Sequence, residues 1–164
     1  MPTTNVALRR VSVVSSRPFD EIVQKLTANI GRPDMNAFHE AIAAATTATD
    51  LERVVNDTIG SSGLMEFARF DAGAVLRKER NGLGPQILRL VVGNPLIMKD
   101  MAKTVPDAAA YAPVTILIDE RDDGVHLSYD LMTSLLSPYG SQAALLVARE
   151  LDTKIEGLLE AAAR

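Results

Sequence analysis

Apolar residues recur every three or four positions in four long segments of the chain. Several of these segments also carry helix start and stop signals, such as a proline or acids at the beginning and a glycine after the end. In the third segment, Thr49 and Glu52 form a capping-box pattern. This spacing predicts helices over residues 18–30, 34–45, 49–60 and 141–162.

Most of the remaining chain has the composition of β-strands. Strands are predicted over residues 5–16, 64–71 and 85–92, with a short helix over 72–80. The stretch "PVTILIDERDDGVHLSYD" adds two β runs around an Asp-Gly pair, which favours a two-residue type I′ hairpin turn. The order of strand, helix, two extra helices, four strands and helix predicts an α+β fold, with helices packed on one face of an antiparallel sheet.

The hairpin places individual side chains. With Asp123 and Gly124 as the loop residues, Arg121 lies opposite His126. Because strand side chains alternate between faces, Tyr129 then lies on the apolar face and His126 points away from the core. We expect the Tyr129 hydroxyl to be hydrogen-bonded, since a buried phenol requires a partner.

The strand predicted over residues 85–92 is apolar on both faces. Ile87 and Val91 lie on one side of it, and Leu88, Leu90 and Val92 lie on the other. A strand of this kind is central in its sheet, or its second face is covered by another part of the structure. We therefore expect a homodimer, and the alternative is that the two extra helices cover this face within one chain.

Composition and charge exclude several kinds of site. The chain of 164 residues has the length of a single domain and contains no Cys, which excludes disulfides and thiolate chemistry. His39 begins a partial zinc motif, but Ala43 occupies the place of the second ligand, so we expect no metal and no cofactor. A net charge of −4 with scattered basic residues argues against nucleic-acid binding. Without a signal sequence or a long apolar run, we expect no membrane contact and a cytoplasmic protein.

The segment Gly93-Asn94-Pro95 ends a predicted strand and begins a predicted helix. Gly93 can adopt a positive φ, Asn94 is a good N-cap, and Pro95 suits the first helical position. This structural role is sufficient to explain the motif. The alternative is that the free N–H groups at this helix start bind a carboxylate or phosphate of a ligand.

His126 is the strongest candidate for proton transfer. It either acts as a general base oriented by Asp119, or it is a solvent-facing strand residue among complementary charges. Glu66 is a second candidate for acid–base chemistry. Because no nucleophile or second histidine is placed to complete a catalytic set, we favour the structural role.

The stretches "VVGNP", "APVTILI" and "VHLSYD", with an Asp-Gly turn between the last two, resemble the bacterial family called domain of unknown function 302. The matching residues are Gly93, Asn94, Pro95, Pro113 and Tyr129, with Val92 where the family usually has an aromatic residue. The resemblance covers residues 5–31 and 64–140. It implies a β-α-β4-α fold similar to one repeat of the TATA-binding protein, often a homodimer, and no established activity. Residues 32–63 are then a helical insertion.

Three function classes follow from the sequence. We favour a binding module in which a small, mostly apolar molecule lies between sheet and helices, with residues 34–60 as a lid. The alternatives are a homodimeric protein-interaction module without a ligand and an acid–base enzyme. For the binding module, the predicted lining is aromatic and methionine side chains, with Asn94 at the polar end: Phe67, Phe70, Met98, Met101, Tyr111 and Tyr129.

Overall fold

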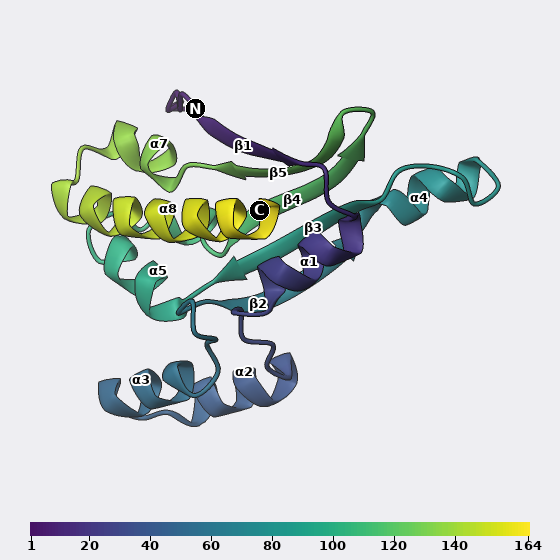
Figure 1. The fold of residues 1–164 in the computed structure, drawn as a ribbon. Helices are drawn as coiled ribbons and strands as arrows, with labels where there is room; N and C mark the ends of the chain where they lie inside the picture. The colour runs from purple at the N-terminus through teal and green to yellow at the C-terminus, as the bar shows by residue number, and fades with distance from the viewer.

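The computed structural model describes residues 1–164 and contains one five-stranded antiparallel sheet with the strand order β1-β5-β4-β3-β2. The α+β fold predicted from the sequence is confirmed (Figure 1). The strands are β1 Arg10–Ser15, β2 Met65–Asp71, β3 Ile87–Gly93, β4 Val114–Arg121 and β5 Gly124–Asp130. The helices are α1 Phe19–Thr27, α2 Met35–Ala44, α3 Ala48–Asn56, α4 Ala72–Glu79, α5 Pro95–Ala102, α6 Ala108–Tyr111, α7 Met132–Leu136 and α8 Gln142–Ala163.

Helices α1 and α8 cover one face of the sheet (Figure 1). Alternate residues of the central strands, such as Ile116, Ile118 and Leu127, point into this layer and are fully buried. The opposite face is more open, and Val14 and Phe70 on it are 48% and 51% exposed. The main core therefore lies on one side of the sheet only.

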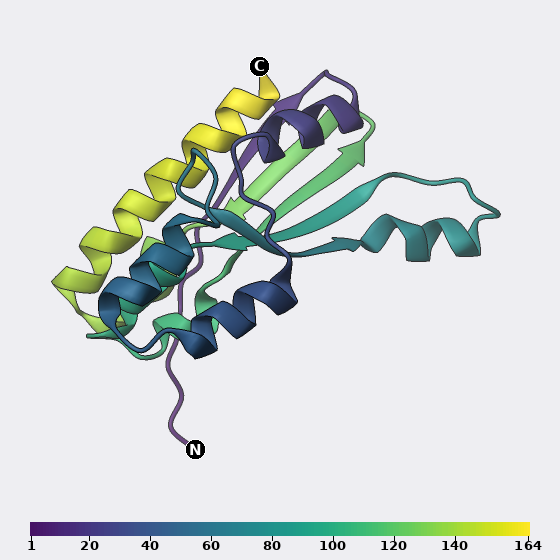
Figure 2. The same cartoon turned by 90° about the horizontal axis from the view of Figure 1, so that it is seen from below.

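The helices α2 and α3 form a separate unit that projects beyond the β2 edge of the sheet (Figures 1 and 2). They pack with the start of β2 around a second, smaller cluster, in which Phe38, Val55 and Met65 are buried. This cluster absorbs the apolar stripes of both helices. Apolar side chains on the open face of the sheet remain exposed. The alternative in which the two extra helices cover this face within one chain was therefore wrong.

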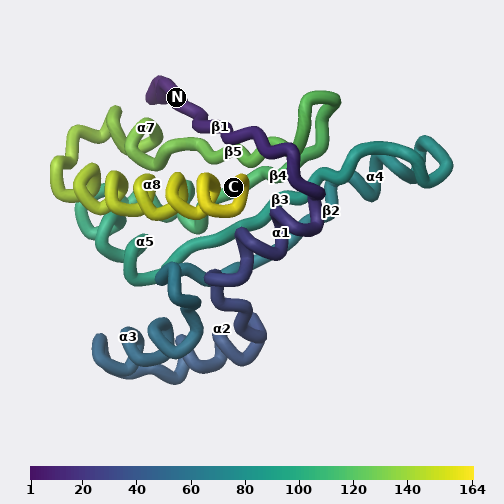
Figure 3. The backbone as a smooth tube through the Cα atoms, in the orientation of Figure 1, coloured from purple at the N-terminus to yellow at the C-terminus, as the bar shows by residue number.

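The two chain segments that enter and leave this helix pair run side by side (Figure 3). Gly31 N–H and Gly60 N–H both donate to the carbonyl of Leu64, at 2.9 Å each. A Cβ on Gly31 would lie 2.0 Å from the Thr58 carbonyl oxygen. Because that oxygen belongs to the backbone, a side chain at this position would force the two segments apart.

Helix α3 begins two residues earlier than the capping-box pattern predicted. Its N-cap is Thr47, whose hydroxyl accepts the Asp50 N–H at 3.0 Å. The predicted cap, Thr49, lies inside the first turn. The prediction was wrong because Thr47 and Asp50 form an equivalent pair, in which the Thr47 hydroxyl also donates to the Asp50 carboxylate at 2.8 Å.

The predicted hairpin register was also wrong. The loop consists of Asp122 and Asp123, and Arg121 pairs with Gly124. Neither aspartate has a positive φ, so the turn is not type I′, and Gly124 instead follows the turn with φ of +135°. The pairing shifts by two residues, which preserves the faces because the side-chain period is two. Tyr129 is therefore buried on the helix-covered face, as predicted.

Candidate functional site

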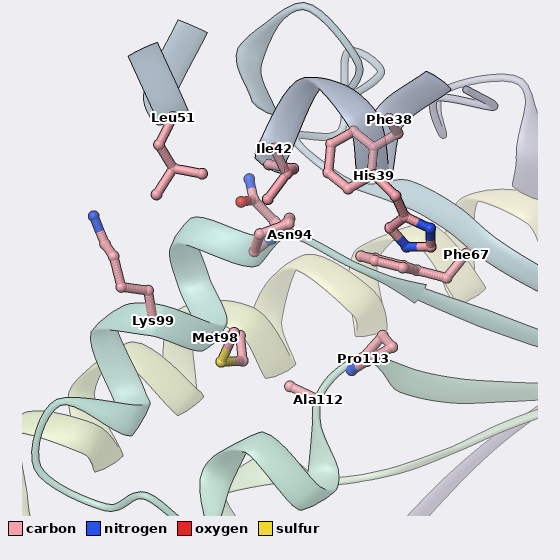
Figure 4. Close-up of a pocket in the computed structure, with 11 residues that line it drawn as sticks. Phe38, His39, Ile42, Leu51, Phe67, Asn94, Met98, Lys99, Ala112 and Pro113 are labelled. Carbon is pink, nitrogen blue, oxygen red and sulfur yellow. The ribbon is translucent and has the colours of Figure 1, made fainter. Parts of the chain in front are cut away.

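A cleft of about 410 Å³ lies between the α2–α3 pair and the start of α5 (Figure 4). Side chains from both helices of the pair face it on one side. The turn at Ala112–Pro113 and residues of α5 form the other side. All of its lining residues except His39, Asn94 and Lys99 are apolar: Phe38, Ile42, Leu51, Phe67, Pro95, Met98, Ala112 and Pro113.

Phe67 reaches the cleft because of an irregularity in β2. The pairing between β2 and β3 shifts between Glu66 and Ala68, which leaves Phe67 as an extra residue in the strand. Its ring then packs edge-on against Phe38 of α2, with centroids 6.4 Å apart and planes at 89°. The bulge thus joins the sheet to the α2–α3 pair at one end of the cleft.

The Gly93-Asn94-Pro95 motif supplies another part of the lining. The Asn94 side chain accepts the Leu96 N–H at 2.8 Å, which confirms its predicted role as N-cap of α5. Its amide also donates to the Gly63 carbonyl at 2.9 Å, so it ties α5 to the loop that follows α3. Gly93 does not have the positive φ that the sequence suggested. A Cβ there would lie 3.1 Å from the Pro113 Cβ, so a side chain at this position would crowd the turn at Pro113.

Phe67, Asn94 and Met98 are the predicted site residues that the structure brings together at this cleft. Met101 is fully buried in the main core instead, because it lies on the inner side of α5. Phe70 lies on the open face of the sheet, where the Arg89 guanidinium is 5.7 Å from its ring centroid.

The two predicted tyrosines also lie elsewhere. The Tyr129 hydroxyl donates to the Asp152 carboxylate at 2.8 Å inside the core, where burial and the neighbouring carboxylate raise the tyrosine pKa. Tyr111 and Tyr139 share a hydrogen bond of 3.0 Å between their hydroxyl groups. This contact, together with nearby Asp107, raises the pKa of Tyr139 to about 12.

The sequence predicted residues 34–60 as a lid but did not assign any of their side chains to the site. Four residues of the α2–α3 pair line the cleft: Phe38, His39, Ile42 and Leu51. Their apolar spacing was visible in the sequence. The face of each helix that meets α5 depends on how the two helices cross, which the spacing of one helix cannot specify. Helical periodicity therefore predicted these two helices but not which of their side chains line the cleft.

The residues considered for acid–base chemistry lie outside the cleft and are engaged with other side chains. The His126 ring contacts the Asp123 carboxylate at 2.8 Å, whereas Asp119 is paired with Arg121. The alternative in which Asp119 orients His126 was therefore wrong, and the favoured solvent-facing placement of His126 was wrong as well. His126 is also only 9% exposed, because it lies on a central strand between Val14 of β1 and Asp119 of β4.

Glu66 is the third of these residues. Its carboxylate accepts two hydrogen bonds from the Arg69 guanidinium, at 2.8 and 2.9 Å, and lies 3.8 Å from Arg32. The carboxylate raises the Arg69 pKa through these hydrogen bonds. Glu66 thus forms a salt-bridge cluster at the start of β2, close to the α2–α3 connection.

Two further properties of the whole structure bear on function. No three His, Asp or Glu side chains come together in a way that would hold a metal ion. None of the helices combines the length and the apolar character needed to cross a lipid bilayer.

Comparison with known proteins identifies relatives of the fold. The family model described as "Domain of unknown function DUF302" matches residues 42–162, which include the end of α2 and all of α3. The match therefore extends into residues 32–63, beyond the segments that carried the sequence resemblance. A structure described as an uncharacterized conserved protein DUF302 from Bacillus stearothermophilus superimposes with a TM-score of 0.66 and 12% identity, over 94% of this chain and 98% of that one. The search of curated proteins gave no significant match.

Proposed function

The chain belongs to the DUF302 family, a domain of unknown function, so its role has to be argued from its own cleft, and we propose that this cleft binds a small, mostly apolar molecule. The walls of the cleft come from both structural units of the chain, the α2–α3 pair and the sheet with α5. A ligand bound there would contact both.

The lining of the cleft is the observation that carries this proposal. Small-molecule sites are typically concave, have volumes of about 300–1,000 Å³, and combine apolar walls with a few polar groups. The cleft has a volume of about 410 Å³, and its only polar lining residues are His39, Asn94 and Lys99. Met98 contributes a flexible thioether that adapts to ligand shape.

Thermal denaturation in the presence of fatty acids, aromatic carboxylates and nucleotides tests the proposal. A ligand that binds the folded state stabilises it by RT ln(1 + [L]/Kd), which is about 2.7 kcal/mol at a hundredfold excess over Kd. We expect one apolar class to raise the Tm of the wild-type protein. The shift should be lost in Phe67→Ala and Met98→Ala, whose side chains line the cleft.

Phe70→Ala is the matched control, because Phe70 lies on the open face of the sheet and is outside the cleft. Each variant is compared with its own unliganded Tm, so a loss of stability does not obscure a loss of binding. A shift that survives Phe67→Ala and disappears in Phe70→Ala would place the ligand elsewhere and overturn the proposal.

Self-association is a second candidate function, and one observation favours it. Helix α4 and the loop after it project from the sheet as an arm (Figures 1 and 2). On this arm Val75 is 66% exposed and Leu83 is 75% exposed. Exposed apolar side chains of this kind mark interaction surfaces, and the open face of the sheet offers a surface for them on a second copy. The mass in solution, measured by light scattering, tests this candidate.

A further inference from the structure

We infer that the ligand of the cleft is an amphipathic anion whose carboxylate pairs with Lys99 and whose apolar tail lies against Phe38 and Phe67. The inference rests on the proposed function and adds the chemical class of the ligand. Figure 4 shows Lys99 and Leu51 toward one end of the cleft and Phe38, His39 and Phe67 toward the other. The cleft is therefore cationic at one end and aromatic at the other.

Lys99 has no carboxylate partner within the protein. No Asp or Glu oxygen lies within ion-pair distance of its ammonium group, although the residue is half-buried beside the cleft. Asp100, which follows it in α5, is paired with Lys103 at 2.7 Å, and Lys99 adds only a longer-range charge interaction that helps to lower the Asp100 pKa. An ammonium without an ion-pair partner in its own chain is available to pair with the charged group of a bound anion.

The charge of the remaining lining supports the same conclusion. The lining of the cleft contains no Asp or Glu, so no carboxylate there would repel an anionic headgroup. The chain as a whole has a net charge of −4, so its overall field does not attract anions. An anion that binds this protein therefore needs a local cation, and Lys99 supplies one next to the apolar walls.

The other two polar lining residues are less suited to the headgroup. The Asn94 side chain already bonds the Leu96 N–H and the Gly63 carbonyl, so both its amide oxygen and its amide nitrogen are engaged within the protein. His39 lies at the aromatic end, next to Phe38 and Phe67, away from Lys99 (Figure 4). An extended ligand with one charged end fits this arrangement better than a compact ligand with several charges.

Calorimetric titration of the full chain with decanoate and with 1-decanol tests the inference, because the two molecules share a tail and differ in the charged group. Lys99→Met keeps the length of the side chain and removes its charge. Lys25→Met removes the same charge on α1, outside the cleft, and is the control. For the wild-type protein and the control, we expect decanoate to bind about three- to tenfold more tightly than decanol, the range for one partly exposed ion pair.

In Lys99→Met the preference for decanoate should disappear while decanol binding is kept. Added salt should weaken decanoate binding to the wild-type protein and leave decanol binding unchanged. A role of Lys99 limited to stabilising the end of α5 would change the Tm without changing the ratio of the two affinities.

The outcomes distinguish a failure of the anionic headgroup from a failure of ligand binding in the cleft. Equal binding of decanol and decanoate, unchanged by Lys99→Met, would overturn the anionic headgroup and keep an apolar ligand in the cleft. Binding of neither molecule to the wild-type protein would overturn this ligand class. If the denaturation screen also gave no stabilising ligand, the proposed binding function would fail with it.

Discussion

At the scale of single residues, Asp152 is a buried carboxylate that holds three parts of the core together. It lies on α8 and accepts the Tyr129 hydroxyl of β5, the N–H groups of Met132 and Thr133, and the Thr133 hydroxyl, at 2.6 to 3.0 Å. A buried carboxylate is costly unless it is bonded in this way. With these donors in place, Asp152 fixes the start of α7 against both the sheet and the long helix.

The sequence could not show this role, although it predicted α8 itself. In an amphipathic helix an Asp next to the apolar stripe is normally assigned to the solvent-facing side. The burial of Asp152 depends on donors that arrive from β5 and α7, which lie about twenty residues away along the chain. The sequence predicted only that the Tyr129 hydroxyl would be hydrogen-bonded, because a buried phenol needs a partner, and it did not predict which residue accepts the bond.

Asp152→Ala leaves several buried donors without an acceptor, and we expect it to lower the free energy of unfolding by about 3 kcal/mol or more. Tyr129→Phe removes one donor and leaves the carboxylate bonded, so it should cost only about 1 kcal/mol. Urea denaturation of the two variants measures both values. Equal losses would mean that the backbone donors of Met132 and Thr133 do not depend on Asp152.

The raised pKa of Tyr129 predicts a loss of stability at alkaline pH. Below its ordinary pKa of 10.0 the hydroxyl is protonated in both folded and unfolded chains, so its contribution to stability is fully present. Above that value the unfolded chain releases the proton and the folded chain holds it, so stability falls as pH rises. Urea denaturation across this range should show a steeper fall for the wild-type protein than for Tyr129→Phe. Parallel curves for the two proteins would contradict the burial of an un-ionised Tyr129.

At the scale of elements, the boundaries of most helices and strands follow from periodicity, whereas the irregular joints between them do not. The predicted helix over residues 18–30 corresponds to α1, Phe19–Thr27, and the predicted strand over 85–92 corresponds to β3, Ile87–Gly93. The bulge at Phe67 and the actual hairpin turn depend on neighbouring strands. For example, a Cβ on Gly124 would lie 2.6 Å from the carbonyl oxygen of Ser15 in β1.

The joint between the sheet and the α2–α3 pair gives a direct test at this scale. Gly31→Ala places a methyl group against the backbone of the returning segment, and we expect a loss of about 1–3 kcal/mol in unfolding free energy. Gly157→Ala is the matched control, because Gly157 lies exposed in α8 with no atom near the new methyl group. It should stabilise the protein by about 0.5–1 kcal/mol through its higher helix propensity. A Gly31→Ala variant as stable as the wild type would show that the two segments can separate freely.

At the scale of the whole molecule, part of the candidate site could be predicted and part could not. Asn94 follows Gly93 directly and Met98 lies one turn further along α5, so the local sequence was enough to place them together. Phe67 lines the cleft because of the bulge in β2, and Leu51 lines it because of the way α3 packs. These contacts depend on tertiary geometry, and the same apolar spacing would have allowed many other arrangements.

The arm formed by α4 predicts a dimer at the same scale. Its Lys78 and Arg80 are basic, whereas the β4–β5 turn carries Asp122 and Asp123, so two copies have complementary charges to bring together. Light scattering at micromolar concentration should give twice the chain mass. Val75→Asp on the arm should give a monomer, because it puts a charge into the contact. Leu146→Asp changes a leucine of α8 that is 57% exposed, and this control should remain dimeric. A monomeric wild-type protein would contradict the interface.

Binding of an apolar ligand in the cleft between α5 and the α2–α3 pair is the central claim, and methionine-methyl NMR tests it most directly. The chain has six methionines, of which Met98 lines the cleft and Met132 is fully buried in the main core. On titration with decanoate, and separately with 1-decanol, we expect the Met98 methyl resonance to move in a saturable way while the Met132 resonance stays in place. A stationary Met98 resonance under conditions in which the ligand raises the Tm, or equal movement of Met98 and Met132, would contradict binding at this cleft.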